Sequence, residues 1–212
     1  MKLYGYWRSS AAYRVRIALH LKGIEFESIP VHLVKNGGEQ HSEDYVALNP
    51  THLVPTLVDG ELTLNQSISI IDYLDAKYPD VALYPQNIED KAVVQALALD
   101  VACEIHPVNN LRVQQYLTQQ LNISDADKLS WSHHWMANGF AAIEQKLAQT
   151  SGQYCFGDQV TMADICLVPQ VYNANRFNLD MSPYPLIRAI VERCNQLPAF
   201  IKALPENQAD AQ

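Results

Sequence analysis

The chain has 212 residues, of which 48% are hydrophobic and 18% are charged, and its formal net charge is −8. This composition is typical of a globular protein, long enough for one large domain or two small ones. The negative charge argues against nucleic acid or an anionic membrane as a partner, because binding phosphates requires clustered Lys and Arg. No stretch approaches the ~18 apolar residues of a membrane span, and the N-terminus lacks the apolar core of a secretory signal, so we expect a cytoplasmic protein.

The cysteines and histidines do not form a metal-binding pattern. The four cysteines are spread along the chain without a CxxC pair, and we expect them to be reduced and mostly buried. His133 and His134 are adjacent, and neighbouring helical residues diverge by about 100°, which disfavours a shared metal ion. We therefore expect no metal site.

The N-terminal pattern is a strand, a helix and a second strand. Residues 2–6 suit a short strand, and residues 13–22 have apolar positions at helical spacing before Gly23, a typical helix end. Residues 26–33 form the second predicted strand, and the proline within it favours the edge or end of a sheet. A β-α-β order with a short crossover predicts parallel pairing.

The next segment predicts a hairpin and another helix. Residues 35–45 (KNGGEQHSEDY) are polar and loop-like. Short strands are expected at 55–58 and 61–64, because the Asp-Gly dipeptide between them suits a tight hairpin turn. A helix with regularly spaced isoleucines is expected to begin at Ser67.

The pattern changes near Tyr84, after a cluster of proline and loop residues. Beyond it no strand of comparable strength occurs, so we predict a second, all-helical domain. The expected division is an α/β domain at 1–80 and an all-α domain at 88–212, with the acidic tail 204–212 mobile. The predicted helices cover roughly 89–120, 125–149, 161–176 and 185–195.

One helix start in the second half has a distinct signal. Thr161 and Asp164 have the spacing of a capping box, in which the two side chains each accept a hydrogen bond from the other residue's backbone N–H. We expect this box to begin a buried helix and to have a structural role. Its loss should lower stability by about 1 kcal/mol.

The junction between the first strand and the first helix carries two hydroxyls, Ser9 and Ser10. The start of a helix has unpaired N–H groups and a positive dipole end, which favour an anion. Two other segments offer similar chemistry: Val54-Pro55, where a backbone can lie along a ligand, and Gln66-Ser67 at the next helix start. Either the serines merely cap the helix, or these segments form a cleft for a peptide-like ligand with a free carboxylate.

Several motifs, taken in chain order, resemble those of the zeta-class glutathione transferases. The resemblance covers nearly all of the chain. It implies a thioredoxin-like N-terminal domain, an all-α C-terminal domain, a homodimer and glutathione as cofactor. The motifs are SSAAYRVRIALHLKG, ALNPTHLVPTLVDG, NQSISIIDYLD, HPVNNLRV, GDQVTMADICLVPQV and NANRFNLDMSPYPLI.

The resemblance assigns residues to glutathione. Ser9, with Ser10 beside it, matches the serine that hydrogen-bonds the glutathione sulfur, and Ala11 replaces the cysteine of the family motif, which indicates that the serine carries the chemistry. The Val54-Pro55 bond is expected to be cis, as in the family. The remaining glutathione contacts implied by the resemblance come from Gln40, Val54, Pro55, Gln66, Ser67, His106, Asn110 and Arg112.

Members of this family isomerise small dicarboxylate diketo acids, either maleylacetoacetate in tyrosine and phenylalanine degradation or maleylpyruvate in gentisate degradation. A dianion requires local positive charge, and Arg8 and Arg176 match family positions near the acidic substrate, with Arg112 as a third candidate. The alternative for Arg176 is a helix-end salt bridge. Arg14 and Arg16 are interpreted instead as helix-face charges or interdomain pairs.

His106 has several open roles. The alternatives are that it orients the substrate, that it contacts glutathione, that it protonates an enolate, or that it is a structural histidine whose hydrogen bonds are all made within the protein. The rival functions are glutathione conjugation or peroxide reduction, and a non-catalytic glutathione-binding module. A thiol–disulfide oxidoreductase is disfavoured, since residues 9–12 contain no cysteine.

Overall fold

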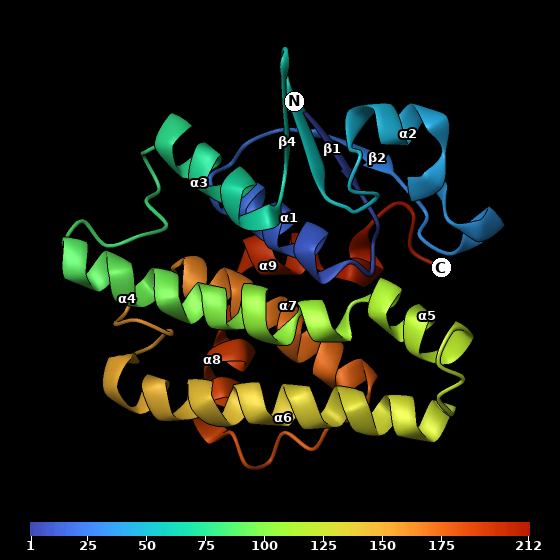
Figure 1. Cartoon of the computed structure of the whole chain (residues 1–212). Coiled ribbons are helices and arrows are strands. Elements are labelled where there is room, and N and C mark those ends of the chain that lie inside the picture. Colours follow the sequence, from blue (N-terminus) through green and yellow to red (C-terminus); the bar gives the residue numbers. More distant parts are fainter. The chain divides into compact units, whose positions relative to one another are not determined.

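A computed structural model describes all residues, 1–212, and the chain divides into two compact units (Figure 1). One unit combines Met1–Ala82 with Leu197–Gln212, and the other is Leu83–Gln196. The sequence division assigned the last segment to the helical domain. In the structure this segment belongs to the first unit, because its helix α9 (Pro198–Ala203) packs against α1 (Ser10–Leu21). None of the helices is long and apolar enough to cross a membrane.

The first unit contains a four-stranded sheet in the order β2-β1-β3-β4 (Figure 1). β1 and β2 are parallel, whereas β3 is antiparallel to both β1 and β4. The predicted parallel pair and the predicted hairpin are confirmed. β2 lies at the edge and ends at Pro30, where a missing backbone N–H is tolerated. The strands are β1 (Lys2–Gly5), β2 (Glu27–Pro30), β3 (Thr56–Asp59) and β4 (Leu62–Asn65).

Two of the helices in this unit were expected and two were not. α1 begins at Ser10, three residues before the predicted start, because Ser9 provides the N-cap. α3 (Ser67–Lys77) begins where it was predicted. α2 (Glu43–Leu48) and α9 are short helices of six residues each, too short for an apolar period to be recognised. α1 packs against α3 as well as α9, and most of its residues are buried.

Of the two interpretations of Arg14 and Arg16, exposed helix-face charges and interdomain pairs, the first is wrong. Both side chains are buried, at 2% and 3% exposure. Arg16 donates from Nη2 to the Trp7 carbonyl at 3.0 Å and from Nε to the Ala203 carbonyl in α9 at 3.1 Å. A buried guanidinium requires such acceptors, and the C-terminal segment supplies one of them.

The C-terminal tail, which was expected to be mobile, makes hydrogen bonds within the first unit. The carboxylate of Asp210 accepts a hydrogen bond from the backbone N–H of Trp7 at 3.1 Å. Gln208 donates from its amide to the carbonyls of Lys202 and Leu204, at 2.9 and 2.8 Å. The tail thus satisfies carbonyls at the end of α9, which would otherwise lack partners.

The second unit is all-helical, as predicted, but residues 89–120 do not form one helix. A π-helical segment, Asp100–Ile105, and a 3-10 turn, Pro107–Asn109, interrupt it. Pro107 lacks the N–H that a continuous α-helix needs and its ring clashes with the preceding turn. The helices are α4 (Ile88–Leu99), α5 (Leu111–Gln119), α6 (Asp125–Thr150), α7 (Met162–Arg176) and α8 (Pro185–Cys194).

The capping box predicted at the start of α7 is present. Asp164 is fully buried, and its carboxylate accepts hydrogen bonds from the backbone N–H groups of Cys155 and Thr161, each at 2.8 Å, and from the Thr161 hydroxyl at 3.1 Å. Burial raises the pKa of the Asp164 carboxyl, while these hydrogen bonds oppose the rise. The carboxylate therefore joins the 155–161 loop to the first turn of α7.

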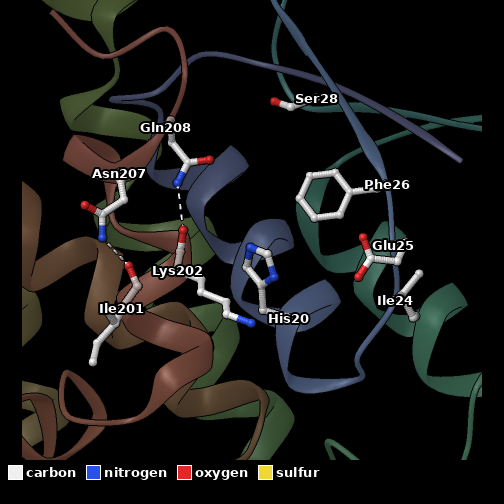
Figure 2. A pocket seen from close by; sticks show the side chains of 9 residues that line it. All are labelled: His20, Ile24, Glu25, Phe26, Ser28, Ile201, Lys202, Asn207 and Gln208. Atoms are coloured by element: carbon white, nitrogen blue, oxygen red, sulfur yellow. Dashed lines mark hydrogen bonds between the residues drawn. The ribbon is translucent and has the colours of Figure 1, made fainter.

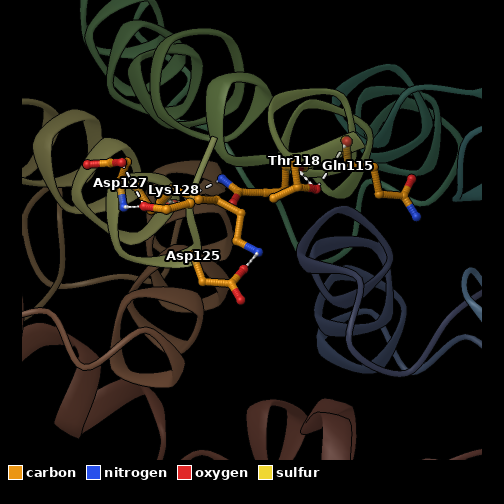
Figure 3. Close-up of polar contacts among 8 residues, drawn as sticks. Gln115, Thr118, Asp125, Asp127 and Lys128 are labelled. Atoms are coloured by element: carbon orange, nitrogen blue, oxygen red, sulfur yellow. Dashed lines mark hydrogen bonds and ion pairs between the residues drawn. The ribbon is translucent and has the colours of Figure 1, made fainter. Parts of the chain in front are cut away.

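The exposed start of α6 provides a comparison (Figure 3). Ser124 caps this helix by accepting a hydrogen bond from the N–H of Asp127 at 3.1 Å, and its own hydroxyl donates to the Asp127 carboxylate at 2.6 Å. Lys128 and Asp125 form an ion pair at 2.6 Å beside it. Solvent can replace these contacts when they are removed, because the residues are exposed.

Replacing Asp164 with alanine should lower the free energy of unfolding by about 3 kcal/mol or more, because three buried donors lose their acceptor. Asp127→Ala should lower it by less than about 1 kcal/mol. Urea denaturation of both variants checks this difference. Equal losses would contradict the assignment of Asp164 as the buried link.

Candidate functional site

The strand directions bring three loop segments to one edge of the sheet. Tyr4 of β1 pairs with Thr56 of β3, and Thr56 pairs with Asn65 of β4. Because β3 runs opposite to its neighbours, the end of β1, the start of β3 and the end of β4 lie at the same edge. The segments that follow or precede them are the start of α1, the Val54-Pro55 turn and the start of α3. The candidate residues Ser9, Val54, Pro55, Gln66 and Ser67 therefore gather at this edge.

Ser9 has the first of the two roles that the sequence left open, the helix cap, and its geometry is compatible with the second. Its Oγ accepts a hydrogen bond from the N–H of Ala12 at 3.2 Å, so it is the N-cap of α1. A hydroxyl accepts through a lone pair and donates through its O–H. The cap therefore leaves the Ser9 proton for an anion at the positive end of α1. Ser10 is the first residue of the helix and is buried.

The start of α3 is joined to α1 by a buried hydrogen bond. Arg14 donates from Nη1 to the hydroxyl of Ser67 at 3.3 Å. Ser67 is 5% exposed, and its own proton remains for an acceptor. Gln66 precedes it with a φ of +66°, a conformation that non-glycine residues adopt at some energetic cost. Strained backbone of this kind is common where a loop presents its groups to a ligand.

The Val54-Pro55 peptide bond is cis, as expected. The carbonyl of the preceding Leu53 accepts hydrogen bonds from the Tyr45 hydroxyl at 2.6 Å and from the Asn49 amide at 2.8 Å. These bonds hold the carbonyl that directly precedes the Val54-Pro55 turn. Sequence reasoning missed both supporting residues. The NP dipeptide at Asn49 was the available signal, since it is typical of a turn.

Gln40 has a buried side-chain oxygen that suits a peptide ligand. The residue is 6% exposed, and its amide nitrogen donates to the Leu33 carbonyl at 3.2 Å. Its Oε1 is buried and has no partner within the protein. A buried acceptor without a donor is costly unless a ligand supplies one. The N–H groups of glutathione can do so, and the hydroxyls of Ser9 and Ser67 suit its sulfur and carboxylate, so these residues fit the cofactor.

Three candidates of the second unit lie close together in the sequence, between His106 and Arg112. Asn110 caps α5 by accepting a hydrogen bond from the N–H of Arg112 at 3.2 Å, and its Nδ2 lies 3.5 Å from Nε2 of His106. His106 is half-buried and Arg112 is exposed. His106 and Asn110 thus lie in the turn between the π-helical segment and α5, and Arg112 is in the first turn of α5.

The other two candidate arginines lie on separate elements. Arg8 is exposed beside Ser9, and its guanidinium carbon lies 4.2 Å from the centre of the Trp7 ring, a favourable cation–π distance. Arg176 is the last residue of α7 and is exposed, with its guanidinium carbon 5.8 Å from the Phe177 ring centre.

A pocket of about 440 Å³ lies at the other end of α1 (Figure 2). Its lining includes His20, Phe26, Lys202 and Gln208, and none of the candidate residues. Burial, and then the charge of Lys202, lowers the pKa of His20. The His20 and Phe26 ring centres are 5.5 Å apart. The pocket is separate from the sheet edge, since the twelve-residue helix between them is about 18 Å long.

Comparisons with known proteins agree with this geometry. Residues 8–77 match the family model "Glutathione S-transferase, N-terminal domain", and residues 136–193 match "Glutathione S-transferase, C-terminal domain". A probable maleylacetoacetate isomerase of Vibrio cholerae is 56% identical, over 99% of this chain and 97% of the relative. A maleylpyruvate isomerase of Ralstonia is 46% identical, over all of both chains.

The solved structures agree as well. The maleylacetoacetate isomerase of Methylobacterium extorquens AM1, with bound malonate and glutathione, superposes over all of both chains with a TM-score of 0.96 and 36% identity. The predicted fold, a thioredoxin-like domain followed by an all-α domain, is confirmed by these matches. A maleylpyruvate isomerase described as a bacterial glutathione S-transferase of the zeta class superposes over all of both chains with a TM-score of 0.97 and 45% identity. The chain belongs to the zeta class of the glutathione S-transferase family.

Proposed function

We propose that the chain is a glutathione-dependent cis–trans isomerase that converts maleylacetoacetate to fumarylacetoacetate in tyrosine and phenylalanine degradation. The observation that carries the proposal is the Ser9 hydroxyl, which caps α1 and keeps its proton for an anion. The relative from Vibrio cholerae, at 56% identity, supports maleylacetoacetate as the substrate. Family membership supports glutathione as the cofactor, a homodimer and a cytoplasmic location.

The proposal assigns glutathione binding to the first domain and substrate binding to the second. Residues 1–80 bind glutathione through Ser9, Gln40, Val54, Gln66 and Ser67, and residues 88–212 bind the substrate. Bound glutathione supplies a sulfur nucleophile that adds reversibly to the cis double bond, so that the bond can rotate.

Ser9 favours the ionised form of that sulfur in two ways. A free thiol has a pKa of about 8.5 and is mostly protonated at neutral pH. The Ser9 O–H donates a hydrogen bond to the anion, and the N-terminus of α1 contributes a positive dipole end. Ser9 accepts no proton in this role, so it needs no histidine partner such as a nucleophilic serine requires.

The substrate is a dianion in a protein of net charge −8. Arg176, Arg112 and Arg8 are proposed to hold its carboxylates, since a guanidinium pairs with carboxylate through two parallel hydrogen bonds. The maleylacetoacetate isomerase of Methylobacterium extorquens AM1 with bound malonate, a dicarboxylate, supports this assignment. His106, close to Asn110, is proposed to orient the substrate or to protonate its enolate.

A second candidate substrate is maleylpyruvate, which the Ralstonia relative at 46% identity favours. Both substrates carry the same acidic diketo group and would engage the same arginines. General glutathione transfer or peroxide reduction, and a module that binds glutathione without turnover, are the remaining alternatives.

Substrate turnover separates these functions. The purified protein, with glutathione, should remove the cis-enol absorbance of maleylacetoacetate or its analogue maleylacetone, with a higher kcat/KM than for maleylpyruvate. The reverse ratio would assign the chain to gentisate degradation. Glutathione binding with no loss of either substrate would favour the non-catalytic module, and covalent adducts that accumulate would favour a transferase.

Replacing Ser9 with alanine should raise the pKa of the bound glutathione thiol and lower kcat/KM about 10- to 100-fold, because a hydrogen bond to a charged group is lost. Titration of the thiolate absorbance measures the pKa directly. Ser9→Thr retains the hydroxyl and should retain most of the activity.

A matched control separates this effect from loss of a helix cap. Ser124→Ala removes the same type of cap from α6 and should cost about 1 kcal/mol of stability with unchanged turnover. An unchanged thiol pKa in Ser9→Ala would remove Ser9 from the mechanism.

Replacing Arg176 with alanine should raise the KM for the dicarboxylate substrate about 10- to 100-fold, because one carboxylate loses a charged partner. The KM for a neutral conjugation acceptor should change little. Arg188→Ala removes an exposed arginine of α8 and serves as the control. Equal effects on charged and neutral acceptors would show that Arg176 acts on structure and not on substrate charge.

A further inference from the structure

Two histidines outside the proposed glutathione contacts meet beside Gln40. His41 ends the short 3-10 turn Glu39–His41, and His52 lies in the loop before Leu53. Their Nδ1 atoms are 3.1 Å apart and their ring centres 5.2 Å apart. At this distance one Nδ1 donates a hydrogen bond to the other, so the pair joins two loops that are separate in the sequence.

The neighbouring groups fix which nitrogen donates. The Leu33 carbonyl can only accept, so the amide nitrogen of Gln40, 3.2 Å away, must face it. The same nitrogen lies 3.2 Å from Nε2 of His41, which is therefore the acceptor. His41 then carries its proton on Nδ1 and donates to Nδ1 of His52. The result is a chain of hydrogen bonds from Gln40 through His41 to His52.

The His52 end of this chain is anchored. The next residue, Leu53, has its carbonyl held by Tyr45 at 2.6 Å and Asn49 at 2.8 Å. His52 itself has a φ of +57°, a left-handed conformation in which histidine, asparagine and aspartate are the most common non-glycine residues. The turn that presents Val54 is therefore a fixed support for the histidine pair.

The Gln40 end of the chain lies in a loop that needs such a support. Asn36, Gly37 and Gly38 all have positive φ values, and glycine gives this backbone little conformational preference of its own. A Cβ on Gly38 would lie 2.5 Å from the Gln40 amide nitrogen, so the loop closes tightly over the amide. The Leu33 carbonyl holds the amide nitrogen through one hydrogen bond, and His41 adds a second that keeps the amide in place.

We propose that His41 and His52 are positioning residues that hold the Gln40 amide with Oε1 available to an N–H group of glutathione. The inference rests on the proposed function, in which Gln40 contacts the cofactor. Oε1 is the buried acceptor without a partner in the protein, and its direction follows once His41 holds the nitrogen. The pair also fixes the Gln40 loop relative to the Val54 turn, so that both sides of the peptide ligand are held together.

A double-mutant cycle tests this coupling. His41→Ala and Gln40→Ala should each raise the glutathione Kd about 5- to 10-fold, as expected for loss of one hydrogen bond to the cofactor. His41→Ala should change kcat at saturating glutathione less than about twofold. In the Gln40→Ala background, His41→Ala should add less than about twofold, because the group that it positions is absent. Additive effects would overturn the proposal, since they would mean that His41 acts independently of Gln40.

A conservative variant and a control complete the test. His52→Asn retains an acceptor for His41 and suits the positive φ, so its Kd should stay within about twofold of the wild type, whereas His52→Ala should match His41→Ala. His134→Ala removes an exposed histidine that likewise has one side-chain partner, Asn138 at 3.1 Å, and should leave the glutathione Kd unchanged. Failure of His52→Asn to restore binding would contradict the relay.

The same titrations distinguish this inference from the proposed function. Calorimetry on the wild-type protein measures glutathione binding before any variant is compared. If the wild type does not bind glutathione, the proposed function fails. If the wild type binds and turns over substrate but the cycle is additive, only the role of the histidine pair fails.

Discussion

The reversal of strand direction between β1 and β3 is the constraint on which the candidate site depends. β1 pairs in parallel with β2 and antiparallel with β3, and β4 reverses again. This pattern places the end of β1, the start of β3 and the end of β4 at one edge of the sheet. Two helices, α1 and α3, then begin at that edge, and the Val54-Pro55 turn lies between them. A register shift of one residue would exchange the buried and exposed faces of these strands, so the core of the sheet also fixes the site.

Two helix N-termini at one edge concentrate positive potential in an acidic protein. Each start contributes unpaired N–H groups and the positive end of a helix dipole. Arg14 adds a buried guanidinium that bonds to Ser67 at 3.3 Å. Because the surrounding protein excludes water from this cation, its field is screened less than that of a surface arginine. The edge is therefore suited to a ligand that carries negative charge at both its sulfur and its carboxylate.

The sequence predicted the elements that have a strong local signal. The β3–β4 hairpin followed from one Asp-Gly dipeptide, and the start of α7 followed from the spacing of Thr161 and Asp164. Both signals depend on backbone chemistry within four residues, which tertiary contacts did not override. The start of α1 was placed three residues late because the apolar spacing begins at Tyr13, whereas the cap that ends the preceding turn is Ser9.

The contacts that support the site could not be predicted in the same way. Arg14 and Arg16 look like surface charges in a helical pattern, and their burial depends on partners in α3, α9 and the loop before α1. The C-terminal segment was assigned to the helical domain because it follows those helices in the chain. Its contacts with α1 arise only in three dimensions. Separation along the sequence does not predict such contacts, because a buried polar group needs a hydrogen-bond partner that is close in space, wherever that partner lies in the chain.

The residue at position 11 bears on how much of the chemistry Ser9 must supply. Zeta-class motifs have a cysteine at this position, and this chain has alanine, inside the first turn of α1. A second thiol at a helix start would itself be ionised more easily and would share the positive dipole end with the glutathione sulfur. With alanine there, the cap geometry and the Ser9 proton act on one sulfur atom only. In the proposed function the field of α1 therefore acts on the cofactor alone, and the hydroxyl that caps the start of the helix is also the proposed donor to the anion.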